Sequence, residues 1–421
     1  MSRPGGVAVV AGASMAGLMT AAALQPWYRR VVVFDRDALP ETPRARRCVG
    51  QGRHAHGLLT TSVDVLEELL PGITAEFVAN GARRDDLAAD VAWVSNGHHL
   101  ATAPSDLRGL AVSRVLLEHH VRARVAALPG VEIHPEHIVT GIDVTDGAVR
   151  RVRVASSGPD QWVDADLVVD ATGRASRLPD WLAQAGYPRP REEQLRVDLY
   201  YVSRVYTRDP ARIDSILIGP TADAPRAGAL LWLEGDRWIA SLAGYGVRPP
   251  FGEAEYLDYA ASLPSPLIAE TVAGAEVLDG PHIFHIPANL WRRYDEATAW
   301  PAGLLPLGDS ISVLNPLYGQ GITLAAIQAR LLRDLLADRL DDLASRYLPR
   351  CAEPVANAWA IATAGDAALT DPSFQPGPDD ERVARFFEAA ATDPDLTQLF
   401  LEVINLKQPY SRLTDPQTLP V

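Results

Sequence analysis

The residue types best suited to chemistry gather in three glycine-containing segments. They read Gly12-Ala13-Ser14-Met15-Ala16-Gly17, Gly308-Asp309 and Pro316-Leu317-Tyr318-Gly319-Gln320-Gly321. Glycine lets a backbone approach a phosphate closely, and the free N–H groups at the start of a helix attract anions. No G-x-S-x-G or H-E-x-x-H segment supplies a nucleophile or a zinc site. We therefore expect these segments to bind a nucleotide-type ligand.

The first segment stands inside a strand, glycine turn, helix, strand order. Residues 7–10 are a short apolar run, an Ala- and Leu-rich helix is expected to about Gln25, and a second apolar run at 31–34 ends at Asp35. This is the order of a dinucleotide-binding βαβ unit, in which Asp35 accepts hydrogen bonds from a ribose. Ser14 replaces the usual middle glycine, so a strand-turn-helix that binds nothing stays open as an alternative.

The composition describes a globular protein. Of 421 residues, 47% are hydrophobic, and the net charge of −14 argues against a nucleic-acid partner. The length exceeds one compact core, so two or more domains are expected. The start shows no signal-peptide pattern, no apolar run reaches the roughly 18 residues of a membrane span, and Cys48 and Cys351 are too few for a disulfide framework. A cytoplasmic protein is expected.

A polar loop, Gln51-Gly52-Arg53-His54-Ala55-His56-Gly57, precedes a predicted helix at 58–70. On a strand, His54 and His56 would share one face. Two histidines without a third ligand do not indicate a metal site, and no metal is expected. The loop either packs against a bound ligand or is held by its own hydrogen bonds.

Two further segments are expected beside the first glycine turn. Ser113 is a good N-cap for a helix through Ala127, and Arg114 in its first turn opposes the helix dipole, so it needs a partner or a task. Residues 165–170 form a buried-type strand that ends at Ala171-Thr172-Gly173, as in a parallel sheet. Ligands bind beyond the carboxyl ends of such strands.

The middle of the chain predicts a second, largely antiparallel sheet. Tyr201, Trp232 and Tyr245 lie on it, where they either line an apolar pocket or form ordinary sheet core. The expected strands are 195–207, a hairpin over 229–242 with its turn at Glu234-Gly235-Asp236, a strand around 282–286, and a short pair within 90–100.

The other elements are a small sheet, a returning strand and a helical end. Strands at 131–133 and 141–154 are expected to form the small sheet. A buried strand at 302–307 leads into Gly308-Asp309, and a long helix is expected from Ile322 to about Leu340. From Asp341 the chain is helix-prone.

Taken together, the βαβ start, Gly308-Asp309 and the loop at 316–321 resemble the flavoprotein monooxygenases of the para-hydroxybenzoate hydroxylase type, over nearly all of residues 5–340. The resemblance implies an α/β fold with a Rossmann-like FAD-binding domain, a mainly antiparallel substrate domain and a C-terminal helical segment. The implied boundaries are 1–75 with 108–185 and 287–340 for the FAD domain, 76–107 with 186–286 for the substrate domain, and 341–421 for the helical segment.

The resemblance also implies cofactor contacts. Asp309 would bind the ribityl or ribose part of FAD, and Arg114 would contact FAD as well. No residue is expected to be catalytic with certainty, because the flavin carries the chemistry and Pro316, Gly319, Gln320 and Gly321 lie beside its ring. The expected FAD contacts are Gly12, Ser14, Met15, Ala16, Gly17, Asp35, Arg36, Arg46, Gln51, His54, Arg114, Thr172, Gly173, Gly308, Asp309, Gly319, Gly321 and Ile322. The expected substrate pocket holds Tyr201, Trp232, Tyr245, Pro316 and Leu317.

A narrower resemblance involves residues 51–59, 170–174 and 201–206. These segments resemble the bacterial FAD-dependent epoxidases of polyketide and polyether pathways, which are similar to squalene epoxidases. The chain departs from that group at Cys48 and Gly50, where Gly and Pro are usual. Many aromatic hydroxylases carry an Asp-Gly pair that serves FAD and NADPH, and here the region reads Asp170-Ala171-Thr172-Gly173. Direct use of NADPH or NADH and supply through a separate flavin reductase therefore both stay open.

The implied reaction inserts one oxygen atom from O2 through a flavin C4a-hydroperoxide, epoxidising an alkene of an apolar polyketide-type intermediate of antibiotic biosynthesis. An aromatic hydroxylase of the same fold, a flavin-dependent dehydrogenase or reductase, and a flavin-containing cyclase without a redox role are the alternatives. An alkene has no proton to lose, so no protein base is expected. The expected partners are a small apolar substrate, O2 and, if separate, a flavin reductase.

Overall fold

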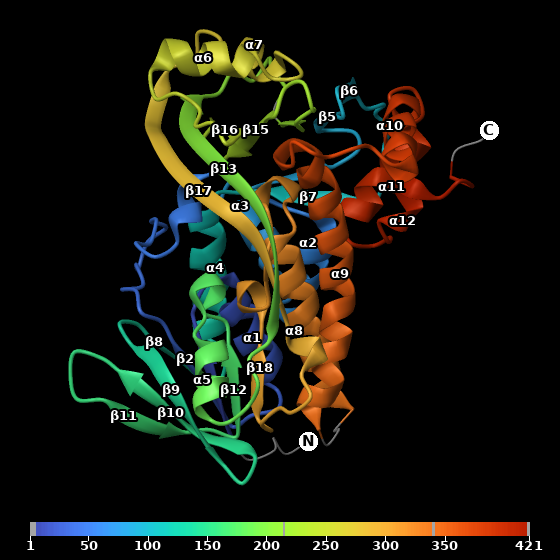
Figure 1. Ribbon diagram of the computed structural model, residues 1–421. Helices are drawn as coiled ribbons and strands as arrows, with labels where there is room; N and C mark the ends of the chain where they lie inside the picture. The colour runs from blue at the N-terminus through green and yellow to red at the C-terminus, as the bar shows by residue number, and fades with distance from the viewer. Residues whose placement is uncertain (1–5, 214, 339–341, 419–421) are drawn as a thin grey trace.

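The computed structural model describes residues 6–213, 215–338 and 342–418. Within these ranges the chain forms a parallel sheet and a larger, mainly antiparallel sheet, joined by the long strands β13 (Arg191–Thr207) and β17 (Val277–Arg293) (Figure 1). The predicted fold class, a Rossmann-like α/β unit with an antiparallel second sheet and C-terminal helices, is confirmed. The predicted helix end near Leu340 and the start of the chain lie outside the described residues.

The parallel sheet carries the first glycine turn at its centre. Its described strands run in the order β18-β12-β1-β2-β8. Ala11 is the register partner of Asp170, which in turn is the partner of Pro306, so the turns that follow these strands emerge at one edge of the sheet. The strands are β1 (Val7–Ala11), β2 (Arg30–Phe34), β8 (Val131–His134), β12 (Leu167–Asp170) and β18 (Leu304–Pro306).

Strand β8 departs from the sequence prediction. It pairs in parallel with β2, from Val31 opposite Val131 to Phe34 opposite His134, instead of joining the small sheet. That sheet is a meander of β9 (Ile138–Thr145), β10 (Ala148–Ala155) and β11 (Gln161–Asp164). A short apolar run has the same pattern in either sheet, so its pairing partner cannot be deduced from the pattern.

Helices cover the parallel sheet. The helix α1 (Met15–Leu24) is buried at every position except Ala16, as its Ala and Leu content predicts, and packs between α4 (Arg114–Ala126) and α8 (Gly321–Ala337). Next to α8 lies α2 (Thr60–Leu69). The smaller elements here are α3 (Ile73–Ala79), α5 (Leu178–Gln184) and a sheet of β3 (Gly57–Leu58), β7 (Arg108–Ala111) and β4 (Arg83–Asp86).

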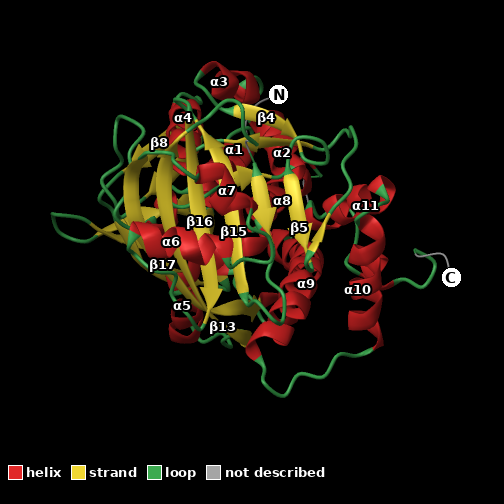
Figure 2. Ribbon diagram, turned by 90° about the horizontal axis from the view of Figure 1, so that it is seen from above, coloured by secondary structure: helices red, strands yellow, loops and turns green. Residues whose placement is uncertain are grey.

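The antiparallel sheet runs in the order β19-β17-β13-β16-β15-β14-β5-β6 among the described strands. Helices α6 (Glu253–Ala261) and α7 (Leu267–Val272) cover one of its faces, over a core that includes Tyr206 and Trp238 (Figure 2). The opposite face carries Tyr201 and Tyr245, against which Leu317 packs. The remaining strands are β5 (Ala92–Ser95), β6 (His98–His99), β14 (Ile216–Ile218), β15 (Arg226–Leu233), β16 (Arg237–Tyr245) and β19 (Ser312–Val313).

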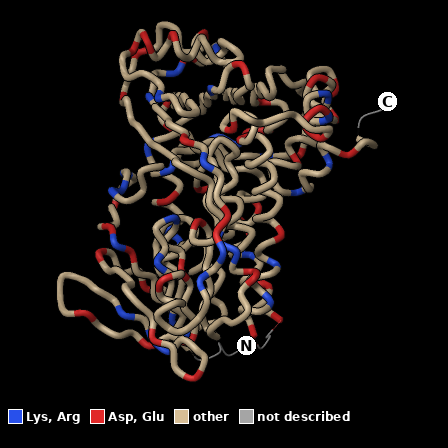
Figure 3. The backbone as a smooth tube through the Cα atoms, viewed as in Figure 1, with Lys and Arg blue, Asp and Glu red and all other residues tan. Residues whose placement is uncertain are grey.

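The C-terminal part is helical, as predicted. Helix α9 (Leu343–Thr370) lies beside α8 and reaches the antiparallel sheet, while α10 (Pro378–Ala390), α11 (Pro394–Ile404) and α12 (Ser411–Thr414) gather near β5 and β6 (Figure 1). Acidic and basic residues are interspersed along these elements (Figure 3). In the described part of the chain, no helix combines the length and apolar character needed to cross a bilayer, and no three His, Cys, Asp or Glu side chains are grouped for a metal ion.

Candidate functional site

The first glycine turn packs tightly enough to exclude side chains. Gly12 has φ +107°, and a Cβ there would lie 2.5 Å from the carbonyl oxygen of Ala171. A Cβ on Gly17 would lie 1.8 Å from the carbonyl oxygen of Gly12, so only glycine allows α1 to lie this close to the strand. Ser14 has an ordinary extended backbone (φ −91°, ψ −174°), which explains why serine fits where the usual pattern has glycine.

The start of α1 is left open to an anion. Among the described residues, no side chain caps its first N–H groups, and its first turn carries no acidic residue. The hydroxyl of the N-cap residue Ser14 instead accepts a hydrogen bond from Arg114 (2.7 Å) and contacts Glu118 (3.1 Å). Uncapped N–H groups together with the helix dipole make this end suited to phosphate.

Asp35, at the end of β2, is tied to the same turn. One carboxylate oxygen accepts the N–H of Ala13 at 2.6 Å, and the other accepts that of Asp37 at 2.8 Å. The guanidinium of Arg46 lies 3.1 Å from the first oxygen, with both side chains almost fully buried. Asp35 is therefore held in one orientation and placed beside the glycine turn, as the βαβ pattern predicts.

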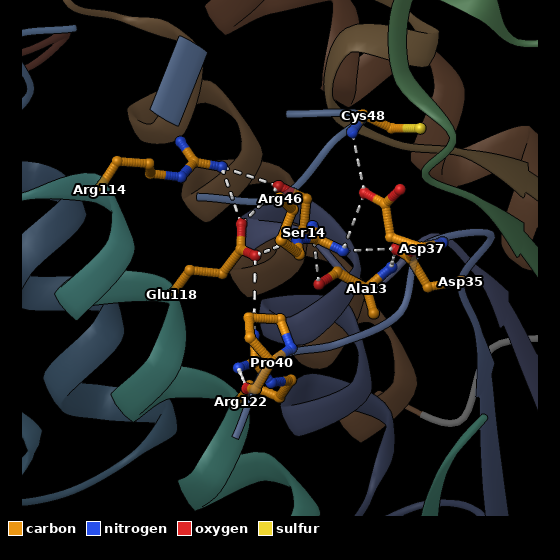
Figure 4. Close-up of polar contacts among 10 residues, drawn as sticks. All are labelled: Ala13, Ser14, Asp35, Asp37, Pro40, Arg46, Cys48, Arg114, Glu118 and Arg122. Atoms are coloured by element: carbon orange, nitrogen blue, oxygen red, sulfur yellow. Dashed lines mark hydrogen bonds and ion pairs between the residues drawn. The ribbon is translucent and has the colours of Figure 1, made fainter. Parts of the chain in front are cut away.

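The carboxylate of Glu118 links Ser14 of the glycine turn to three arginines. Ser14, Glu118 and the arginines Arg46, Arg114 and Arg122 are called the Glu118 cluster (Figure 4). Its carboxylate lies 2.6 Å from Arg46, 3.5 Å from Arg114 and 3.8 Å from Arg122. The prediction that Arg114 needs a partner is confirmed, since Ser113 caps α4 and turns Arg114 toward Ser14 and Glu118. Burial lowers the pKa of Arg114, and Glu118 opposes that shift.

A hollow opens over the Glu118 cluster. It is lined by Arg44, Arg46, Val49, Arg114, Val115, Glu118 and Arg122. Arginine outnumbers acidic side chains in this lining, and its planar fork of donors matches phosphate oxygens. The hollow therefore suits the anionic part of a nucleotide.

Asp309 lies where the strands β12 and β18 end. Gly308 before it has φ +67°, and a Cβ at Gly308 would lie 2.8 Å from that of Ala16 in α1. The N–H of Gly173 donates to the hydroxyl of Ser310 at 3.0 Å, which joins the two turns. Burial raises the pKa of Asp309, while the charges of Arg114, Arg174 and Arg292 favour its ionised form.

The third glycine segment leads into a second open helix start. Pro316 and Gly319 are exposed, Gly319 has φ +67°, and α8 begins at Gly321. No described side chain caps α8, and its first turn, which contains Ile322, has no acidic residue. A Cβ on Gly321 would lie 4.0 Å from a carboxylate oxygen of Asp309. The starts of α1 and α8 therefore meet beside Gly308-Asp309.

The histidine loop is not a strand, so the condition under which His54 and His56 would share one face is not met. A 3-10 turn, Gly50–Arg53, precedes His54. Its glycines and polar residues lack the alternating apolar pattern of a strand. His54 then packs between the rings of Tyr201 and Phe284. Its Nδ1 lies 2.7 Å from the hydroxyl of Ser203, and the Nδ1 of His56 lies 2.9 Å from the carbonyl of His54.

The two tyrosines of the predicted pocket direct their hydroxyls away from open space. Tyr201 donates to the side-chain oxygen of Asn315 at 3.2 Å, and Tyr245 donates to the carboxylate of Asp366 at 2.7 Å. Their rings belong to a buried apolar cluster against which Leu317 packs. Only the rings of Tyr201 and Tyr245 can therefore line a pocket.

The prediction for Trp232 is wrong. It pairs in register with Trp238, which belongs to the core under α6 and α7, on the face opposite Tyr201. Its indole N–H donates to the carbonyl of Gly81, and Arg208 lies over its ring at 4.5 Å. Side chains alternate along a strand, so a difference of one position puts a residue on the other face.

The structure brings most of the predicted cofactor residues to one place. Around the meeting point of α1 and α8 lie Gly12, Ser14, Met15, Ala16, Gly17, Asp35, Arg46, Arg114, Thr172, Gly173, Gly308, Asp309, Gly321 and Ile322. Gln51 lies in the 3-10 turn before His54, and Arg36 is exposed on the loop after β2.

Sequence reasoning missed several polar residues of the site. These are Glu118, Ser203, Ser241, Asn289, Asn315 and Asp366. Asn315 was available as a signal, because it precedes Pro316 and caps the short turn that follows by accepting the N–H of Leu317. Asp366 had no local signal, since its partners come from distant strands.

Comparison with known proteins places the chain. No family model matches it. In an alignment over 423 residues, the chain is 32% identical to Protein Rv3254 of Mycobacterium tuberculosis (strain ATCC 25618 / H37Rv). The alignment covers 95% of this chain and 89% of that protein. The chain belongs to the family of this mycobacterial protein.

Solved structures share the fold at lower identity. The flavin-dependent brominase Bmp2 superposes with a TM-score of 0.69 at 12% identity, covering 96% of this chain and 94% of that one. The p-nitrophenol 4-monooxygenase PnpA of Pseudomonas putida DLL-E4 gives 0.68 at 18%, covering 96% and 99%. The Diels-Alderase PyrE3 of pyrroindomycin biosynthesis gives 0.64 at 20%, covering 97% and 82%. The chain thus has the fold of flavin-dependent monooxygenases and halogenases.

Proposed function

We propose that the chain is an FAD-dependent monooxygenase. The observation that carries the proposal is the convergence of two uncapped helix starts, those of α1 and α8, on Gly308-Asp309. Two positive helix ends beside one carboxylate suit a ligand that has both anionic and hydroxyl groups. The flavin-dependent brominase Bmp2, which has the same fold, supports FAD as that ligand.

The residues at this place fit FAD along its length. Asp35 would hold the adenosine ribose, and the start of α1 with the arginine-lined hollow would hold the pyrophosphate. Asp309 would bind the ribityl chain, and the loop at 319–321 would lie against the ring. Nε of Arg114, Nε2 of His54 and Oε1 of Gln320 are buried without a partner among the described residues, which leaves them available to a ligand.

Reduced FAD, when bound, supplies the activation of O2 that oxygen insertion requires. The chain would contribute binding and the exclusion of water, through the apolar cluster of Tyr201, Ala243 and Ile286 next to the loop of Leu317. The free N–H groups at the start of α8 would favour negative charge on the part of the ring that they face.

His54 is poorly placed to act as a base. Burial and the nearby His282 lower its pKa to about 4. The hydroxyl oxygen of Ser241 accepts the N–H of Ala55, and its proton is donated to Ser203. Ser203 in turn donates its proton to Nδ1 of His54, so that both hydroxyl protons have an acceptor. Nε2 then carries the ring proton, and no free lone pair remains to take a proton from a substrate.

A loop histidine that offers no free lone pair favours a substrate that needs no base. An alkene is already a nucleophile, whereas a phenol gains reactivity when a base removes its proton. We therefore propose epoxidation of an apolar, polyketide-type alkene, in line with the resemblance to bacterial polyketide epoxidases. Electrons would come from NADPH or NADH, directly or through a separate flavin reductase.

The test is oxygen stoichiometry with a polyene substrate and chemically reduced flavin. The proposal expects one O2 consumed for each product and one oxygen atom from ¹⁸O2 in that product. Product formed with oxidised flavin and no oxygen uptake would contradict it and identify a cyclase. Turnover that transfers electrons without incorporating oxygen would instead identify a dehydrogenase or reductase, and reaction of phenols in place of alkenes an aromatic hydroxylase.

A further inference from the structure

A buried carboxylate on the C-terminal helix α9 holds the third glycine segment in place. Asp366 is 0% exposed. One of its oxygens accepts hydrogen bonds from Tyr245 (2.7 Å), Asn315 (2.8 Å) and Tyr318 (3.2 Å), and the other accepts one from Asn289 (2.7 Å). A buried carboxylate is costly unless hydrogen bonds satisfy it, and described donors do so here. These residues are called the Asp366 cluster.

The two amide donors of the Asp366 cluster, Asn289 and Asn315, cannot reverse their roles. The side-chain oxygen of Asn289 accepts the backbone N–H of Asn315 at 2.6 Å, so its amide nitrogen must point at Asp366. The side-chain oxygen of Asn315 accepts from Tyr201 and from the N–H of Leu317, so its nitrogen must also point at Asp366. The surroundings of Asp366 are therefore built for an acceptor without a proton of its own.

Asn315 and Tyr318 are the two members that belong to the loop before α8. Asn315 caps the turn Pro316–Tyr318, which leads directly to Gly319 and to the open helix start at Gly321. Tyr318 reaches Asp366 across the backbone of Gly365, where a Cβ would lie 2.1 Å from the phenol oxygen. Gly365 and Asp366, which are neighbours in α9, thus both contact the side chain of Tyr318.

We propose that Asp366 is a positioning residue, which fixes the loop from Asn315 to Gly321 in the conformation that receives the flavin ring. The inference rests on the proposed function, since it assumes that this loop meets the flavin. It gives the C-terminal helical segment a role at the cofactor site, through the hydrogen bonds that Asp366 accepts from Asn315 and Tyr318. Asp366 acts only through Asn315 and Tyr318.

The substitution Asp366→Asn separates charge and hydrogen-bond direction from side-chain volume. Whichever way the new amide is turned, its N–H group faces a fixed amide donor, Asn289 on one side or Asn315 on the other. The loop should then shift while the rest of the fold stays. The adenosine half of the ligand would lie at Asp35, which is not a member of the Asp366 cluster, so it provides an internal reference.

The experiment measures the dissociation constants of FAD and of ADP by calorimetry for the apoprotein and its variants. Asp366→Asn should weaken FAD at least tenfold and leave ADP within twofold. Asp371→Asn, at the exposed end of the same helix, is the matched control and should change neither constant. Gly365→Ala keeps the carboxylate but displaces the Tyr318 phenol, so it should also weaken FAD selectively.

The outcomes separate this inference from the proposed function. Wild-type FAD affinity in both Asp366→Asn and Gly365→Ala would overturn the positioning role. Equal weakening of FAD and ADP in both variants would overturn it too, since that marks a general loss of structure. If the wild-type protein binds neither ligand, the proposed function fails before the inference is reached. If Asp366→Asn does not fold, Gly365→Ala decides the question.

Discussion

The guanidinium of Arg46 lies 3.1 Å from the carboxylate of Asp35, and both side chains are buried beside the first glycine turn. The same carboxylate accepts the N–H of Ala13, so Asp35 supports the turn as well as facing the place where a ribose would bind. A substitution at Asp35 therefore has two measurable consequences.

Asp35→Ala should weaken FAD binding by about 1–3 kcal/mol, because ribose hydroxyls lose their acceptor. It should also lower the free energy of unfolding of the apoprotein by about 1–3 kcal/mol, since the buried N–H of Ala13 loses its acceptor, while Arg46 keeps Glu118 as a partner. Calorimetric FAD titration and urea unfolding measure the two effects separately. Wild-type FAD affinity in this variant would show that Asp35 does not hold the ribose.

Gly17→Ala should damage the fold rather than only the ligand site. The added Cβ would lie 1.8 Å from the carbonyl oxygen of Gly12, so α1 must move away from the strand. We expect a loss of about 3 kcal/mol in the free energy of unfolding, as for an overpacked core. Gly141→Ala in β9 is the control, because a Cβ there meets only the side chain of Arg153 at 3.8 Å. Equal stability of the two variants would mean that the turn is looser than described.

His54 should make the stability of the apoprotein depend on pH. Burial and His282 lower its pKa to about 4 in the folded protein, against 6.5 ordinarily, so between these values the unfolded chain binds more protons. Stability should fall as the pH drops from 6.5 to 4, by up to about 3 kcal/mol. His54→Gln should make this part of the pH profile of the melting temperature less steep, and the slope that remains is expected from His56, whose pKa is lowered as well. His99→Gln, at an exposed position of β6, should leave the profile unchanged.

Neither histidine of the loop should be needed as a base. His54→Gln and His56→Gln, supplied with reduced flavin, oxygen and a polyene, should both retain epoxidation, although FAD binding can weaken. Burial and Arg114 lower the pKa of His56 to about 3, so it too is neutral at working pH. Loss of oxygen transfer at normal FAD occupancy in either variant would assign that histidine to the chemical step.

The sequence predicted those features that follow from local patterns. The βαβ order located the glycine turn and Asp35, and the unfavourable place of Arg114 in its helix pointed to the partners that it has in Ser14 and Glu118. Such features depend on neighbours within one or two elements, where periodicity and capping rules apply.

Features that depend on distant pairing could not be predicted. Asp366 lies 121 positions from Tyr245 and 48 from Tyr318, and nothing near it in sequence marks it as buried. Trp232 was grouped with Tyr201 and Tyr245, although it lies on the other face of the sheet, because the alternation of side chains leaves the choice of face to tertiary packing. The sheet to which β8 belongs was predicted wrongly for a related reason, since its short apolar run carries no information on its pairing partner.

The central claim is that this chain holds FAD without a covalent bond. Absorbance of the purified protein tests it most directly, followed by denaturation and chromatography of the released material. The account predicts a yellow protein that releases free FAD, and lower FAD occupancy in Asp309→Ala, whose side chain no longer meets the ribityl hydroxyls. A colourless protein that takes up no added FAD would contradict it.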